Sequence, residues 1–210
     1  MIRRGLNFGV ALAAMVVTSP VWALAAAWIK LEDRGPVFFR QERAGRGGAV
    51  YRIFKFRTMV VDAEKRGLGL NVDRTDPRIT RAGAFLRRWS LDELPQLLNV
   101  LRGEMNVVGP RPGLPEQARR YDATQRRRLE VLPGLTGWAQ VNGRNALTWS
   151  QRIAADVWYV DHCSALLDLW ILARTPLAIV RSEGLYETNA GLDDEFNAFD
   201  AEGDSRDEPS

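Results

Sequence analysis

The chain has 210 residues, 46% of them hydrophobic, which is enough to bury one sizeable core. Its single cysteine, Cys163, and single histidine, His162, exclude an intrachain disulfide, a Cys/His zinc site and a histidine-dependent triad, which leaves carboxylates, Lys/Arg, hydroxyls or an oxygen-bound hard metal for chemistry. Residues 1–191 carry a net charge of +10, with 28 Lys/Arg against 18 Asp/Glu, which indicates an anionic partner such as nucleic acid, a phosphorylated metabolite or a membrane surface.

An apolar stretch over residues 5–29 is long enough to meet the ~20 residues needed to cross a bilayer. Three structures compete for it: a cleaved signal peptide, a spanning helix, and a re-entrant helix that returns to the face it entered. The stretch exceeds the usual apolar region of a signal peptide, about 7 to 15 residues. Basic residues flank it on both sides, Arg3 and Arg4 before it and Lys30 and Arg34 after it, which favours two cytoplasmic ends.

Pro20 lies in the middle of this stretch, where it removes a backbone donor and predicts a kink. The hydroxyl of Ser19 can satisfy the carbonyl that the kink frees. Each half-helix then reaches only about 20 Å, short of the ~30 Å hydrocarbon core. We therefore expect residues 1–34 to form a re-entrant helix, broken at Ser19-Pro20 and embedded in one leaflet.

A β-hairpin and a basic helix are expected to open an α+β domain over residues 35–185. Residues 36–41 and 50–56 have the composition of short strands, and a glycine-rich turn joins them. Residues 60–66 are expected to be briefly helical, followed by a polar loop. Residues 79–89 then predict a basic helix.

An acidic pair, Asp92 and Glu93, precedes an amphipathic helix that ends at Gly103 and is predicted from the spacing of Leu94, Leu97, Leu98 and Leu101. Ser90 and Glu93 match a capping box, whereas Pro95 would lose a bond one turn inside, so the two signals place the helix start at different residues. In both cases the pair lies in or just before the first turn, where the positive end of the helix favours negative charge.

The remaining elements are expected to be short and partly interfacial. Val107-Val108 is followed by a loop, a charged helix, a glycine-rich loop and two helices, expected at residues 109–112, 114–130, 133–144, 148–162 and 165–182. The last helix is too short and too charged to span a bilayer, so it belongs in the core or at a membrane interface. Trp158, Tyr159 and Trp170 fit either place equally. Residues 186–210, strongly acidic from residue 192, are expected to be disordered.

Cations bracket Asp92 and Glu93 in the sequence. An adjacent acidic pair is by itself most often a solvated helix start. Phosphoryl transfer, however, requires carboxylates that bind Mg²⁺ or attack, together with guanidinium groups that neutralise phosphate oxygens. Pro110 and Pro112 restrict the loop that carries Arg111. The other nearby cations are Lys55, Arg57, Arg87 and Arg88.

Five motifs occur in order along the chain: Gly35-Pro36-Val37-Phe38-Phe39-Arg40-Gln41-Glu42-Arg43, Lys55-Phe56-Arg57-Thr58-Met59, Ser90-Leu91-Asp92-Glu93-Leu94-Pro95-Gln96, Val108-Gly109-Pro110-Arg111-Pro112 and Pro133-Gly134-Leu135-Thr136-Gly137. Together they resemble the bacterial sugar transferase family, whose members are monotopic phosphoglycosyl transferases. The resemblance covers about residues 1–185, and the Ser19-Pro20 break resembles the re-entrant membrane helix of that family. It implies a monotopic protein at the cytoplasmic face of the bacterial inner membrane.

The resemblance implies a reaction in two displacements. Asp92 would attack the β-phosphorus of a UDP-sugar and release UMP, after which polyprenyl (undecaprenyl) phosphate would accept the sugar phosphate. Asp92 and Glu93 would also hold Mg²⁺, which offsets charge repulsion and stabilises the leaving group. No nucleic acid partner is expected. The residues expected to contact substrate phosphates are Arg88, Arg111, Lys55 and Arg57.

The donor sugar is less defined than the reaction. The segment at residues 141–145, the absence of an extra multi-span N-terminal region and the short C-terminal part resemble the small members that act on N-acetylated amino sugars. Glucose- or galactose-phosphate transfer is the alternative. Two further hypotheses are a direct transfer in which the acidic pair only holds Mg²⁺, and a non-catalytic membrane-anchored protein that binds nucleic acid or anionic lipid.

Overall fold

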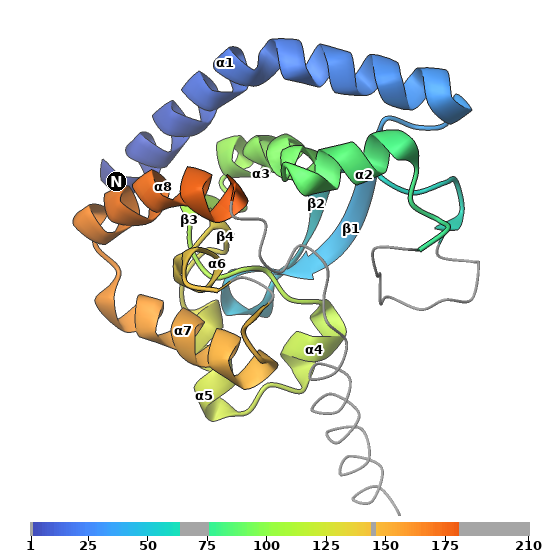
Figure 1. The fold of residues 1–210 in the computed structure, drawn as a ribbon. Helices are drawn as coiled ribbons and strands as arrows, with labels where there is room; N and C mark the ends of the chain where they lie inside the picture. Colours follow the sequence, from blue (N-terminus) through green and yellow to red (C-terminus); the bar gives the residue numbers. More distant parts are fainter. Residues whose placement is uncertain (1, 64–75, 144–145, 181–210) are drawn as a thin grey trace, which may run out of the picture.

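The structure is a computed structural model that describes residues 2–63, 76–143 and 146–180 (Figure 1). Helices lie on both sides of two small two-stranded sheets, so the described chain has the mixed α+β composition that the sequence predicts. The predictions for most of the polar loop before α2 and for the acidic tail lie outside the described residues.

Helix α1 (Ile2–Asp33) runs continuously through Pro20, where the sequence predicts a break. Proline has no amide hydrogen to donate to the carbonyl one turn earlier, which is that of Val16. The Ser19 hydroxyl donates a hydrogen bond to this carbonyl at 2.8 Å, which confirms the predicted role of the serine. The helix is therefore bent rather than divided, and Figure 1 shows it curving along the top of the molecule.

Both ends of α1 pack against the same body. Ala11 is fully buried in a cluster with Val100, and Ala25 and Ile29 are buried in a second cluster with Phe56. Among the described residues, α1 is the one helix long and apolar enough to cross a membrane by length and composition. Its outer face exposes large apolar side chains, namely Leu6, Phe8, Leu12, Val16, Val17, Leu24, Trp28 and Leu31.

Strands β1 (Phe38–Ala44) and β2 (Val50–Phe56) form the predicted antiparallel hairpin, with the first strand two residues later than expected. The turn requires glycine, because Gly47 and Gly48 have φ values of 65° and 82° in the left-handed region. Odd-numbered residues of the two strands are cross-strand partners and share one face of the hairpin. This face carries Lys55, which forms an ion pair with Glu93 of the 3-10 helix η3 (Leu91–Gln96).

Helix α2 (Arg81–Arg88) is the predicted basic helix, and the chain turns sharply after it. Ser90 adopts a left-handed conformation with φ of 54°, and its side chain does not cap the next helix, so the predicted capping box is wrong. Pro95 lies inside η3, and α3 (Leu97–Arg102) begins only after it. The predicted amphipathic helix is thus a tight turn that carries the acidic pair, followed by a short α-helix that ends at Gly103 as predicted.

A second sheet forms where the sequence indicates mainly loops. Strand β3 (Asn106–Val108) pairs in parallel with β4 (Gly134–Thr136). The two backbones approach closely here, since a Cβ added to Gly134 would lie 2.0 Å from the amide nitrogen of Gly109. Strands of three residues are too short for periodicity to reveal them, which explains why the sequence predicts a loop.

The charged helix expected at residues 114–130 is interrupted. Asp122 begins a new helix, because its carboxylate accepts a hydrogen bond from the amide of Gln125 at 2.8 Å. Competition from this local cap ends the preceding helix early. The segment therefore forms three short helices, α4 (Pro115–Arg119), α5 (Ala123–Arg126) and η4 (Arg127–Leu129).

Two longer helices, α7 (Trp149–His162) and α8 (Ala165–Val180), confirm the predicted C-terminal pair. Tyr159 is a core residue, with 1% of its surface exposed. Trp158 and Trp170 are partly exposed and stack on Trp138 of the short helix α6 (Trp138–Val141), with ring centroids 4.2 and 5.2 Å apart.

Candidate active site

The acidic pair lies in η3, between the hairpin and the loop that carries Arg111. The left-handed turn at Ser90 redirects the chain after α2, and the next residues pack against β2. Asp92 is 9% exposed and Glu93 is also largely covered. Both acids lie in the first turn of η3, as the sequence predicts for the start of a helix, although α3 itself starts only at Leu97. Side-chain cations also stabilise these charges.

Glu93 is held by two of the predicted cations. Lys55 of β2 lies 3.0 Å from its Oε1, and Arg111 donates hydrogen bonds of 2.8 and 3.4 Å to its two oxygens. Burial alone would raise the pKa of the Glu93 carboxyl, but Arg111 and Lys55 outweigh burial and hold the pKa well below its usual range. Glu93 is therefore an ionised and spatially fixed carboxylate.

Asp92 differs from its neighbour, because no described side chain donates a hydrogen bond to its carboxylate. Burial raises its pKa to about 6, with Lys55 lowering it and Glu93 raising it further. Adjacent carboxyls whose surroundings separate their pKa values suit different chemical roles. The free Asp92 oxygens can attack or bind a ligand, whereas Glu93 is occupied in orienting cations.

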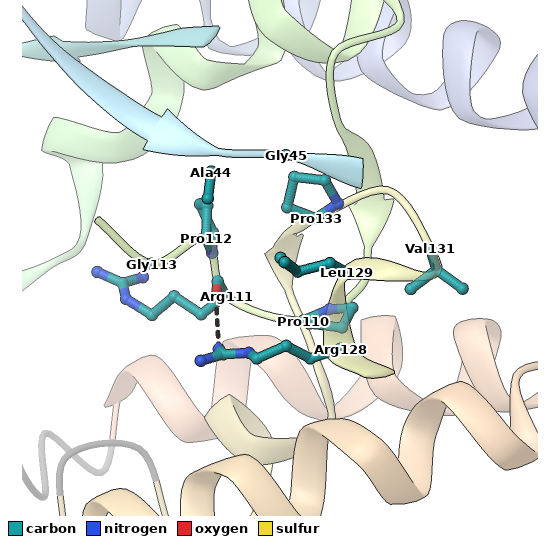
Figure 2. A pocket seen from close by; sticks show the side chains of 10 residues that line it. All are labelled: Ala44, Gly45, Pro110, Arg111, Pro112, Gly113, Arg128, Leu129, Val131 and Pro133. Carbon is teal, nitrogen blue, oxygen red and sulfur yellow. Dashed lines mark hydrogen bonds between the residues drawn. The ribbon is translucent and has the colours of Figure 1, made fainter. Parts of the chain in front are cut away.

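Arg111 projects from a restrained loop. Gly109 donates to the carbonyl of Thr136 at 2.9 Å, and the Gly113 carbonyl accepts from Ala44 at 2.9 Å. Figure 2 shows a small pocket between this loop and the end of β1, with the guanidinium of Arg111 extending away from it. The loop is thus tied to β4 on one side and to β1 on the other.

Two predicted phosphate contacts lie elsewhere. Arg57 is 6% exposed, pairs with Asp33 at the end of α1, and donates to the carbonyl oxygens of Pro36 and Met59. Its guanidinium thus fastens α1 to the hairpin. Arg88 is exposed on α2 and lies over the ring of Trp89, 5.8 Å from its centroid. The structure brings Asp92, Glu93, Lys55 and Arg111 together, without Arg57 and Arg88.

Arg87 faces the site in place of Arg88, although only Arg88 was among the residues expected to contact substrate phosphates. Its Nε donates to the Thr58 hydroxyl at 2.9 Å, and its charge lowers the pKa of Asp92. Both arginines lie on the predicted basic helix, α2. Residues adjacent on a helix point about 100° apart, so only one of them can face the acidic pair.

Arg43 is a residue that the sequence analysis missed. It pairs across the hairpin with Tyr51 and shares the face of Lys55. Its Nε and the Tyr51 hydroxyl are buried without a hydrogen-bond partner. Burial, together with the nearby charge of Arg111, lowers the pKa of Arg43 to about 10. The sequence contains a signal for Arg43. Counting every second residue back from Lys55 along the predicted strand leads to Tyr51, which pairs with Arg43 across the hairpin.

The described residues contain no group of three or more His, Cys, Asp or Glu side chains that could enclose a metal. Mg²⁺ commonly binds one or two carboxylates and completes its coordination with substrate phosphates and water. Asp92 and Glu93 fit that pattern, and Lys55 and Arg111 already bind Glu93. The oxygens of Asp92 are therefore the better donors.

Comparison with known proteins identifies the family. Residues 1–182 match the family model described as bacterial sugar transferase. The chain is 42% identical over 189 residues to the "Uncharacterized sugar transferase EpsL" of Bacillus subtilis, covering 90% of this chain and 92% of that protein. It is 37% identical to the "Exopolysaccharide production protein ExoY" of Sinorhizobium fredii, covering 88% of each.

A longer relative has a stated reaction in its name. The chain is 44% identical over 184 residues to the "UDP-glucose:undecaprenyl-phosphate glucose-1-phosphate transferase" of Caulobacter vibrioides, covering 80% of this chain and 66% of that protein. The family match shows that the protein is an enzyme rather than a non-catalytic binding protein. The chain belongs to the bacterial sugar transferase family.

Proposed function

We propose that this transferase moves a sugar 1-phosphate from a UDP-sugar to polyprenyl phosphate and releases UMP. The observation that carries the proposal is the division of roles within the acidic pair. Glu93 is fixed by Lys55 and Arg111, while Asp92 stands beside it with no described hydrogen-bond donor. A carboxylate free to attack, surrounded by cations that suit a diphosphate, supports double displacement.

In the first displacement, an oxygen of Asp92 attacks the β-phosphorus of the donor. The bond between this phosphorus and the bridging oxygen breaks, and UMP leaves with the electron pair. A sugar phosphate then remains on the carboxylate as an acyl phosphate. In the second displacement, a phosphate oxygen of the polyprenyl acceptor attacks the same phosphorus, the carboxylate leaves, and a polyprenyl diphosphate sugar forms.

Charge balance supports a diphosphate ligand. Among the described residues, the cations that act on Asp92 or Glu93 include Lys55, Arg87, Arg111 and Arg43. They outnumber the two carboxylates, and Arg43 is half-buried beside them with a buried Nε that has no hydrogen-bond partner. A surplus of positive charge that is partly removed from water is costly unless an anion offsets it. Mg²⁺ bound with the substrate would supply further charge neutralisation on the phosphates.

A re-entrant α1 at the cytoplasmic face of the inner membrane is part of the proposal. Near the start of the helix, Arg3 pairs with Asp168 of α8 at 2.9 Å; at its end, Asp33 pairs with Arg57. Ion pairs near both ends of α1 thus attach this apolar helix to the same domain. This supports a helix that enters and leaves the membrane on one side. The outward face of α8 is also apolar, with Leu166, Leu169, Leu177 and Val180 exposed. Such a placement brings a soluble nucleotide sugar and a lipid phosphate to one site.

The name of the Caulobacter relative favours glucose as the transferred sugar, which is the alternative in the sequence analysis. The N-acetylated amino sugar remains a prediction without support from the relatives reported above. A donor screen separates the two. Purified protein with undecaprenyl phosphate and Mg²⁺ is incubated with UDP-glucose, UDP-galactose or UDP-N-acetylglucosamine, and UMP is measured.

We expect UMP release with one of these donors, with UDP-glucose preferred. Asp92→Asn keeps the shape of the side chain but removes the nucleophile, so release should fall by at least about 100-fold. Glu116→Gln is the matched control, because Glu116 is exposed and only loosely paired with Arg119 at 3.6 Å. Full activity in Asp92→Asn, or no release with any UDP-sugar, would overturn the proposal.

A further inference from the structure

A buried arginine behind the active-site loop joins three elements. Arg128 of η4 is 4% exposed and pairs with Asp156 of α7, which is completely buried. Its Nη1 also donates to the Tyr121 hydroxyl at 3.0 Å. Its Nη2 donates to the main-chain carbonyl of Arg111 at 2.7 Å, the bond drawn in Figure 2.

Such a pair is poorly explained by stability alone. Removing an arginine and a carboxylate from water costs about as much as their attraction returns, and apolar residues often serve as well. Burial raises the pKa of Asp156 to about 6, while Arg128 and Arg152 lower it, which shows the cost of this site. A planar guanidinium fixes the directions of its hydrogen bonds, because its donors form a rigid fork that holds several acceptors in one geometry.

One of the acceptors that Arg128 holds is the main-chain carbonyl of Arg111. The loop is tied at Gly109 to β4 and at Gly113 to β1, and Arg128 binds the carbonyl midway between these points. Tyr121 supports the same place, since a Cβ added to Gly113 would lie 2.5 Å from its hydroxyl. With its main chain held at three points, the guanidinium of Arg111 meets Glu93 at 2.8 Å.

We propose that Arg128, oriented by Asp156, is a positioning residue that fixes the main chain of Arg111 so that its guanidinium meets Glu93 and the donor phosphate. The part that concerns the phosphate rests on the proposed function. Arg128 touches neither the acidic pair nor, on this proposal, the substrate. Small displacements of a charged group at a phosphoryl-transfer site lower rates strongly, which makes a remote support important.

A double-mutant cycle tests the coupling. Arg128→Lys keeps the charge beside Asp156 but loses the fork, so kcat/KM for UMP release should fall roughly tenfold. Arg111→Met should cost roughly 100-fold. If Arg128 acts through Arg111, the double variant is no worse than Arg111→Met alone. A product of the two losses, roughly 1,000-fold, means that Arg128 acts independently and overturns the proposal.

A second readout does not depend on turnover. Hydrogen exchange in the peptide covering residues 109–113 should be faster in Arg128→Lys than in wild type. Arg127→Lys is the control, because Arg127 is its sequence neighbour but pairs on the surface with Asp161 and Glu130. Asp156→Asn should reproduce the faster exchange, and it replaces Arg128→Lys if that variant does not fold. Unchanged exchange overturns the positioning role, whereas absence of UMP release in the wild type contradicts only the proposed function.

Discussion

Asp92 and Glu93 are adjacent in the sequence, yet their neighbours give them different properties. Lys55 and Arg111 bind Glu93 and lower its pKa, so that carboxylate is ionised at any physiological pH. Asp92 is buried without such partners, and its pKa is raised to about 6. The sequence showed both acids and both cations but not which acid the cations bind, because that depends on the register of η3 against β2.

The raised pKa of Asp92 predicts that the activity depends on pH. A protonated carboxyl cannot attack phosphorus, so kcat/KM should decline as pH falls through the pKa of Asp92. Lys55 is the cation that lowers this pKa most. Lys55→Met therefore raises the pKa, and the acid limb of the pH profile should move to higher pH. Profiles of both proteins at saturating Mg²⁺ measure this, and an unmoved acid limb would contradict the proposed role of Lys55.

Arg43 gives a second prediction at this scale. Its charge near Arg111 and its unpartnered Nε lead us to expect a contact with a substrate phosphate, so Arg43→Met should weaken UDP binding roughly tenfold. Arg52→Met is the control on the opposite face of the same hairpin, where Arg52 forms an exposed pair with Glu42 at 3.2 Å. Calorimetric titration with UDP compares the two. Equal affinities for UDP in the two variants would exclude Arg43 from the site.

Among the elements, α1 shows most clearly what local sequence can and cannot predict. Its length, its apolar composition and the Ser19 bond to Val16 follow from residues close together in the chain. Its continuity through Pro20 does not, because packing of Ala11 and Ala25 on the body holds both halves in place. The parallel pairing of β3 and β4 was missed for the same reason, since it joins segments far apart in the chain.

The proposed re-entrant form of α1 predicts that both of its ends are accessible from one side of the membrane. Gly5 and Lys30 suit single cysteine substitutions, because Gly5 has open space around it and Lys30 is exposed. In a Cys163→Ser background, a membrane-impermeant maleimide should label both positions in inverted vesicles and neither in intact cells. Labelling of the two positions from opposite sides would establish a spanning helix instead.

At the scale of the whole molecule, the long apolar helix α1 is also part of the core. α1 covers clusters that include Ile53, Leu97, Phe56 and Leu86, all at most 2% exposed. The sequence predicted a boundary at residue 34, because composition changes there. The sequence could not show that α1 buries core residues of the domain beyond this boundary, since these contacts are visible only in the packing.

This dependence predicts the result of a truncation. A fragment lacking residues 1–34 exposes apolar surface from both clusters and loses the pair between Asp33 and Arg57. We expect it to aggregate in the absence of detergent and to show no cooperative thermal transition. Size-exclusion chromatography and circular dichroism measure this. A soluble, monomeric and cooperatively folded fragment would show that the two parts are independent.

The measurement that tests the nucleophilic role of Asp92 most directly is the intact mass of the protein after incubation with UDP-sugar and Mg²⁺ in the absence of acceptor. A covalent intermediate predicts a mass increase of one sugar phosphate, present in wild type and in Glu116→Gln, absent in Asp92→Asn, and discharged by undecaprenyl phosphate. An enzyme that turns over with ternary-complex kinetics and never carries this adduct would show that the acidic pair acts without covalent attack.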